Sequence, residues 1–129
     1  MGYTRYWERS ERKVDEQLVN YVKKVLKKCG QLGIGICGWD GSGEPEVRIG
    51  KICFNGNGAK DLDHETFVID DESPNEWKRD FCKTARKPYD YAVRRILKYM
   101  KRNGYLKGLS SDGPNENIVS DEDFLNGKW

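Results

Sequence analysis

A stretch of helical periodicity near the start of the chain constrains the fold more than any other feature of the sequence. Between residues 14 and 29, apolar residues recur at intervals of three and four positions, and lysines fill the opposite side. Ser10 is a suitable N-cap, and Gly30 can adopt the left-handed conformation that ends a helix. The pattern predicts an amphipathic helix that must bury one face against another element.

A second apolar stripe of the same kind covers residues 88–103. Pro88 suits the first turn of a helix because its φ is fixed, and Asn103-Gly104 is typical of a helix end. The spacing predicts a second amphipathic helix with a separate basic row, formed by Arg94, Lys98, Lys101 and Arg102. We expect this row to face solvent, with contact to phosphate as the alternative.

Short β-branched runs separated by turn residues fill the sequence between the two helices. Residues 34–38 form one run, residues 39–43 have the composition of a turn, and residues 47–54 form a second run. We predict that these two runs make a hairpin and that residues 65–69 add a third strand, with antiparallel pairing. We therefore expect a single α+β domain over residues 1–129, in which an antiparallel sheet of three or more strands packs against both helices.

Composition is typical of a folded protein without a membrane anchor. Charged residues make up 34% of the chain, and the 12% of aromatic residues argues against disorder. No apolar run approaches the roughly 18 residues of a membrane span, and the first residues lack the apolar stretch of a signal peptide. We expect a protein of the cytoplasm.

The cysteines do not have the spacing of a metal site. No two of them form a Cys-x-x-Cys pair, and His64 is the only histidine of the chain. We expect no metal and no cofactor. In a reducing compartment we expect free thiols, used mainly as small buried apolar groups, at Cys29, Cys37, Cys53 and Cys82.

The net charge of +2 conceals one strongly basic segment. Residues 78–102 contain ten Lys or Arg against two Asp or Glu, whereas residues 31–77 contain three against ten. The small overall charge argues against general nucleic-acid binding, because nucleic-acid-binding domains usually run strongly basic. The decapeptide 81–90, FCKTARKPYD, lies within the basic segment and is the most informative motif of the chain.

Three known chemistries do not fit this decapeptide. A cysteine phosphatase needs a longer interval between its thiolate and its arginine than the four positions from Cys82 to Arg86. A P-loop needs glycines, which the decapeptide lacks, and a nucleophilic Cys82 would need a base, for which only His64 is available. Anion recognition remains, because the cations precede a helix N-terminus whose free N–H groups already favour negative charge.

The decapeptide predicts a phosphate clamp. Arg86 can hold a phosphate through two parallel hydrogen bonds and is the residue expected to matter most, while Lys83 adds a point charge and Thr84 a hydroxyl. Aromatic rings, Phe81 among them, offer faces on which a base can stack. The alternative is a charged lead-in to a helix, with Arg86 paired to a neighbouring carboxylate. The predicted ligand-binding residues are Arg5, Tyr6, Trp7, Lys83, Thr84, Arg86, Lys87 and Tyr89.

Several motifs together resemble a family of small uncharacterised proteins carried mainly by bacteriophages and prophages. FCKTARKPYD is the most specific motif, and many relatives carry histidine at the position of Arg5. The family has no established activity, so the resemblance implies phage origin, action inside a host cell and a pocket assembled from distant segments. The other motifs are Gly2 to Trp7, Phe54-Asn55-Gly56, Glu65-Thr66-Phe67 and Ser110 to Gly113.

The leading functional hypothesis is a non-enzymatic binding protein for a phosphorylated small molecule, of nucleotide type. By analogy with small oligomeric phage proteins that sequester nucleotide immune signals, its role would be to counter host defence. One alternative is an enzyme acting on such a ligand, with an acid or base among Glu65, Asp90, Asp112 and His64. Another is a phage protein that binds a host protein or nucleic acid through the basic segment.

Overall fold

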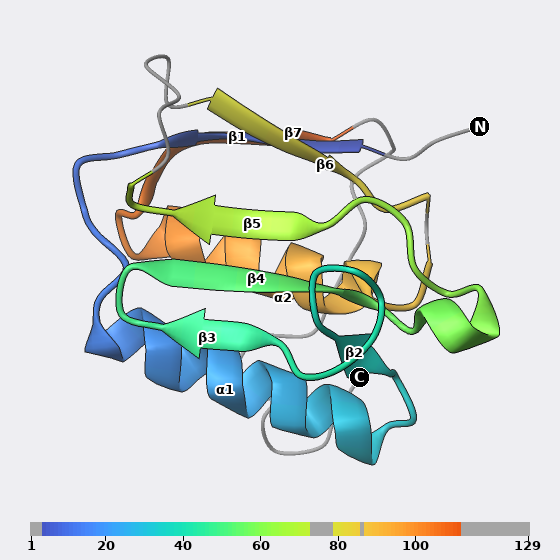
Figure 1. Cartoon of the computed structure of the whole chain (residues 1–129). Helices are drawn as coiled ribbons and strands as arrows, with labels where there is room; N and C mark the ends of the chain where they lie inside the picture. Colours follow the sequence, from blue (N-terminus) through green and yellow to red (C-terminus); the bar gives the residue numbers. More distant parts are fainter. Residues whose placement is uncertain (1–3, 73–78, 86, 112–129) are drawn as a thin grey trace.

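A computed structural model describes residues 4–72, 79–85 and 87–111 (Figure 1). Its two long helices are separated along the chain by a series of short strands. The first half contains β1 (Thr4–Arg9), α1 (Glu16–Gln31), β2 (Ile36–Cys37), β3 (Glu46–Arg48) and β4 (Lys51–Gly56). The second half contains the short 3-10 helix η1 (Gly58–Lys60), β5 (Phe67–Asp70), β6 (Arg79–Lys83), α2 (Asp90–Arg102) and β7 (Leu106–Ser111). Neither of these α-helices is long and apolar enough to cross a membrane.

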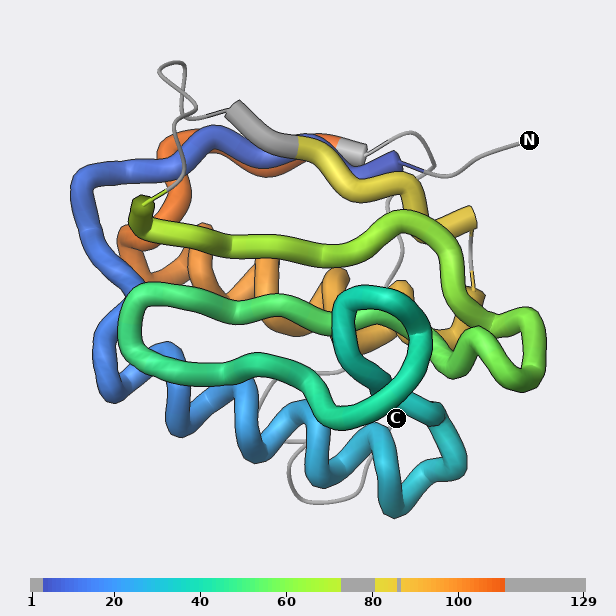
Figure 2. The backbone as a smooth tube through the Cα atoms, viewed as in Figure 1, coloured from blue at the N-terminus to red at the C-terminus, as the bar shows by residue number. Residues whose placement is uncertain are grey.

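The strands form two antiparallel sheets. In the three-stranded sheet, β1 lies between β6 and β7, so that Tyr6 faces Phe81 on one side and Ser110 on the other. In the four-stranded sheet, β4 pairs with β5 along one edge and with β2 and β3 along the other. The tube in Figure 2 shows β5 running between β4 and the three-stranded sheet. The predicted α+β class with antiparallel pairing is confirmed.

Both helices and both sheets contribute to one buried core. The apolar stripes of α1 and α2 are buried, as the helical spacing predicts, except for the partly buried Leu26, and they meet inward-facing residues of β4 and β5. Each buried aliphatic or aromatic side chain contributes about 1.5–3 kcal/mol relative to an exposed position. The largest fully buried apolar side chains are Tyr89, Tyr105, Phe54, Phe67, Leu18, Ile52, Ile69, Ile96, Leu97 and Met100.

The ends of α1 differ from the prediction. Asp15 is the N-cap and its carboxylate accepts a hydrogen bond from the Leu18 N–H at 3.1 Å, whereas the hydroxyl of Ser10 donates to the Gly104 carbonyl at 2.6 Å. At the other end, Gly30 is helical and Gly33, with φ of +80°, is the left-handed residue. The N–H of Ile34 then reaches back to a carbonyl of the last turn, which closes the helix end.

The sheet also differs from the prediction in its connections. Residues 47–54 make two strands, because Gly50 at φ of +94° supports a tight turn between β3 and β4. Residues 36–37 pair with the far end of β4 and not with the 46–48 strand. The three-stranded sheet was not predicted, because its strands carry many charged residues and little β-branched sequence.

Candidate functional site

The decapeptide 81–90 is divided between a strand, a tight turn and the start of a helix. Its first three residues complete β6, and the Lys87 N–H closes the turn on the Thr84 carbonyl at 3.0 Å. Ala85 has φ of +52°, a left-handed conformation that costs a residue with a side chain about 1–2 kcal/mol. Arg86 lies outside the described residues, so its bidentate grip on an anion stays a prediction.

Two of the predicted ligand-binding residues, Arg5 and Thr84, belong to a buried ion-pair network with Asp90. Asp90, in the first turn of α2, accepts hydrogen bonds from Arg5 at 2.9 and 2.8 Å and from the Thr84 hydroxyl at 2.7 Å. Arg5, Thr84 and Asp90 are all buried. A carboxylate at this position also suits the positive end of the helix. The network therefore joins β1, the turn and α2, and its charges already compensate one another.

Two predicted stacking rings belong to the core. The ring of Tyr89 has no exposed surface, and its hydroxyl donates to the Glu65 carbonyl at 2.6 Å. Trp7 packs against Phe67, with ring centroids 5.4 Å apart. Neither ring offers a free face in this arrangement. The buried indole Nε1–H of Trp7 has no acceptor among the described residues.

Contacts around Glu65 bring the separate sequence motifs together. The Glu65 N–H donates to the Lys83 carbonyl, and the Lys83 N–H donates to the Glu65 carboxylate, both at 3.2 Å. Asn55 holds the preceding segment through two hydrogen bonds with the backbone of His64. Gly56 is required there, because a Cβ would lie 2.0 Å from the Leu62 carbonyl oxygen. Segments 4–9, 54–56, 65–67 and 81–90 thus converge at one end of the sheets.

The outer face of the three-stranded sheet is different in character. Tyr6 and Phe81, neighbours on β1 and β6, are 42% and 55% exposed, and their ring centroids lie 6.4 Å apart. Because side chains alternate along a strand, the exposed Lys83 lies on this same face, opposite to buried Cys82. A hollow of about 370 Å³ opens over the face, lined by Tyr6, Glu8, Phe81, Gly108, Leu109, Ser110 and part of Trp7.

The remaining predicted cation is engaged with the backbone. The amine of Lys87 donates to the Asp61 carbonyl at 2.8 Å, which ties the turn before α2 to the residue after η1. Of the two described lysines in the decapeptide, Lys83 alone lies on the outer sheet face together with the exposed rings. The structure thus brings Tyr6 and Lys83 together, and it separates them from Arg5, Trp7, Thr84 and Tyr89.

The chemistry of Cys82 differs from that of a nucleophile. Burial, reinforced by the nearby Glu65 carboxylate, raises the pKa of the Cys82 thiol to about 12, so it stays protonated near neutral pH. Among the acid and base candidates, Asp90 is occupied by Arg5 and Thr84, and Asp112 lies outside the described residues. Within the described ranges, no group of three His, Cys, Asp or Glu side chains is arranged to hold a metal ion.

The lining of the hollow includes residues that were not among the predicted ligand-binding residues. Glu8 supplies a carboxylate, Ser110 a hydroxyl, and Gly108 leaves space between them. They were missed because β1 and β7 were not predicted as strands. The sequence of residues 4–9 has no alternation of apolar and polar residues that could have revealed the strand, because Arg5 and Arg9 are buried with Trp7 while the aromatic Tyr6 is exposed.

Comparison of the chain with protein-family models, with curated proteins and with solved structures finds no match in any of the three.

Proposed function

We propose that the protein is a non-enzymatic binding protein for a phosphorylated small molecule of nucleotide type, and that the ligand lies on the outer face of the three-stranded sheet. The observation that carries the proposal is the exposed pair of Tyr6 and Phe81 beside Lys83, over a hollow of about 370 Å³. A base stacked on these rings gains about 1–3 kcal/mol. Lys83 lies about 6.6 Å further along β6, which suits a phosphate attached through a sugar.

The lining of the hollow supports a base more than a simple anion. Glu8 can accept hydrogen bonds from the amino or ring N–H groups of a base, and the Ser110 hydroxyl can donate or accept. The high pKa of Cys82 and the occupied carboxylate of Asp90 favour binding without turnover. The resemblance of the motifs to phage proteins supports a more specific proposed role. In this role, an oligomeric form of the protein sequesters a nucleotide-derived defence signal in the host cytoplasm.

Calorimetric titration with mononucleotides, cyclic nucleotides and inorganic phosphate tests this proposal. We expect Tyr6→Ala and Phe81→Ala each to weaken binding by roughly tenfold, and Lys83→Ala by several-fold. Trp39→Ala is the matched control, because Trp39 is 69% exposed but lies outside the hollow, and Lys98→Ala controls for the loss of a lysine. Wild-type affinity in both ring variants, or no nucleotide binding by the native protein, would rule the site out.

Two further measurements separate the alternatives. If Arg86→Ala abolishes binding while Phe81→Ala leaves it intact, the ligand belongs to the turn of the decapeptide and not to the sheet face. Chromatography of the ligand after long incubation with the protein distinguishes binding from turnover, since a binding protein returns the nucleotide unchanged.

A second candidate function follows from the same face. Open sheet faces with exposed aromatic residues bind single-stranded RNA in other folds. Fluorescence titration with short oligonucleotides covers this case: affinity that rises with oligonucleotide length and falls steeply with salt indicates a nucleic-acid ligand. A mononucleotide that binds as tightly as the oligonucleotide favours the small molecule.

A further inference from the structure

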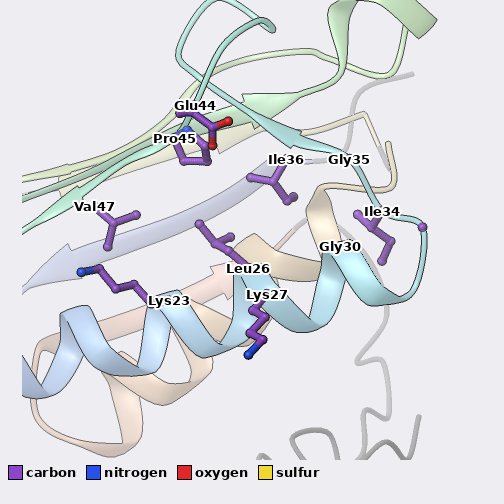
Figure 3. A pocket seen from close by; sticks show the side chains of 11 residues that line it. Lys23, Leu26, Lys27, Gly30, Ile34, Gly35, Ile36, Glu44, Pro45 and Val47 are labelled. Carbon is purple, nitrogen blue, oxygen red and sulfur yellow. The ribbon is translucent and has the colours of Figure 1, made fainter.

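A groove of about 600 Å³ lies between α1 and the strands β2 and β3, away from the hollow over the three-stranded sheet (Figure 3). Its apolar lining comes from Leu26 on α1, Ile34 and Ile36 at β2, and Val47 on β3. All four side chains are only partly buried and pack against the core. In Figure 3, Leu26, Ile36 and Val47 point into the space between the helix and the strands. The groove therefore has a continuous apolar floor that stays accessible.

The charge of the groove is uneven. Lys23 and Lys27 lie one turn apart on the helix wall and are exposed, whereas Glu44 is the acidic residue of the opposite wall. Neither lysine forms an ion pair with another described residue. In Figure 3 the amine of Lys23 extends toward the Val47 end of the groove, and that of Lys27 points away from the strands, although both flexible side chains start from the same wall. Such cations at the border of an apolar floor are complementary to a ligand that has an apolar body and an anionic end.

The strand edge on the other wall argues against an extended peptide. β3 has only three residues, and Pro45 immediately before it has no N–H to donate. A peptide that adds a strand to a sheet needs a row of free backbone groups, and so short an edge supplies few. The volume instead falls within the range of small-molecule sites.

We propose that this groove binds a small anionic amphiphile. An aliphatic or aromatic body lies on Leu26, Ile36 and Val47, and a carboxylate or phosphate contacts Lys23 and Lys27. This site is separate from the sheet face and does not depend on the proposed nucleotide function.

Nuclear magnetic resonance titration with decanoate, decyl phosphate and neutral decanol tests the assignment, with methyl signals of Leu26, Ile36 and Val47 as the readout. We expect saturable shifts at these methyls with both anionic probes. The double variant Lys23→Ala/Lys27→Ala should weaken both by roughly tenfold or more while leaving decanol unchanged. The control Lys13→Ala/Lys24→Ala removes the same charge from exposed positions that do not line the groove, and should bind like wild type.

A separate substitution tests the contribution of the apolar floor to binding. Val47→Thr keeps the shape of the side chain but adds a hydroxyl, so it should weaken decanoate and decanol alike, and thermal melts will show whether the fold is retained. Comparison of decanoate with decyl phosphate identifies which head group the lysines prefer.

Three outcomes would overturn the proposal. The first is that the two double variants bind decanoate with equal affinity. The second is that decanoate shifts only signals of the Tyr6–Phe81 hollow. The third is that an acidic peptide saturates the groove methyls and decanoate does not. Nucleotide titration of the same samples keeps the two sites distinguishable. If the groove does not bind the amphiphiles, Phe81→Ala should still weaken nucleotide binding on the sheet face.

Discussion

The two faces of the three-stranded sheet both carry basic and aromatic residues, but these residues have opposite properties on the two faces. Arg5 and Arg9 point inward and are buried in ion pairs with Asp90 and Asp71, at 2.8 Å each. On the outer side, Tyr6 is exposed beside Phe81, and Lys83 of β6 is also exposed. Cations on the inner side hold elements together, while Lys83 on the outer side forms no ion pair with another described residue. A basic residue in a motif therefore identifies a ligand site only after its face of the strand is known.

The largest effect that tests this comparison is expected for Arg5→Ala. Removal of one partner leaves the Asp90 carboxylate buried with reduced compensation, which typically costs about 3–5 kcal/mol of unfolding free energy. The same substitution at Arg48, whose ion pair with Glu46 is exposed, should change the unfolding free energy little. Denaturant unfolding of both variants measures the difference. If Arg5→Ala retains its stability but loses nucleotide binding, Arg5 is a ligand residue and the comparison fails.

An intermediate effect on the unfolding free energy is expected from alkaline pH, which ionises buried groups such as the Cys82 thiol on the inner side of the three-stranded sheet. Burial raises the pKa of the Cys82 and Cys29 thiols to about 12, above the value of about 8.5 for an exposed cysteine. The raised pKa values mean that the contribution of these two thiols to the unfolding free energy is fully present below about pH 8.5. This contribution is lost progressively as the pH rises toward 12. Burial also raises the pKa of the Tyr89 hydroxyl, which acts in the same direction.

Unfolding free energies measured between pH 7 and pH 10 should therefore decline, and part of the decline should disappear in Cys82→Ala. A pH dependence identical in wild type and variant would show that the Cys82 thiol does not contribute. Over the same range, alkylation of the native protein should modify Cys37, which is partly exposed, well before Cys82.

The smallest effect on stability is expected on the outer face. Phe81→Ala removes a cross-strand contact with Tyr6 that is worth about 0.2–1 kcal/mol, and Lys101→Ala, at an exposed position near the end of α2, should be nearly silent. Thermal melts of the two variants check this. A large fall in melting temperature for Phe81→Ala would assign the ring a structural role and remove the contrast between the two faces.

The sequence by itself determined the helices and the fold class. Apolar spacing in α1 and α2 is a property of neighbouring residues, and so is the end of α2 at Asn103-Gly104. The N-cap of α1 was predicted wrongly, because a tertiary contact engages the residue that local sequence indicated. There Ser10 binds the distant Gly104 carbonyl, and Asp15 takes the capping role.

The tertiary structure alone decided the three-stranded sheet and, with it, the candidate site. Tyr6 meets Phe81 and Ser110 across long intervals of sequence, and Arg5 meets Asp90 across 85 residues. The residue types of the site were predicted, but their division into a buried network and an exposed face was not. That division depends on strand register, since a shift by one residue exchanges the two faces, and register is set by pairing between segments that no local pattern links.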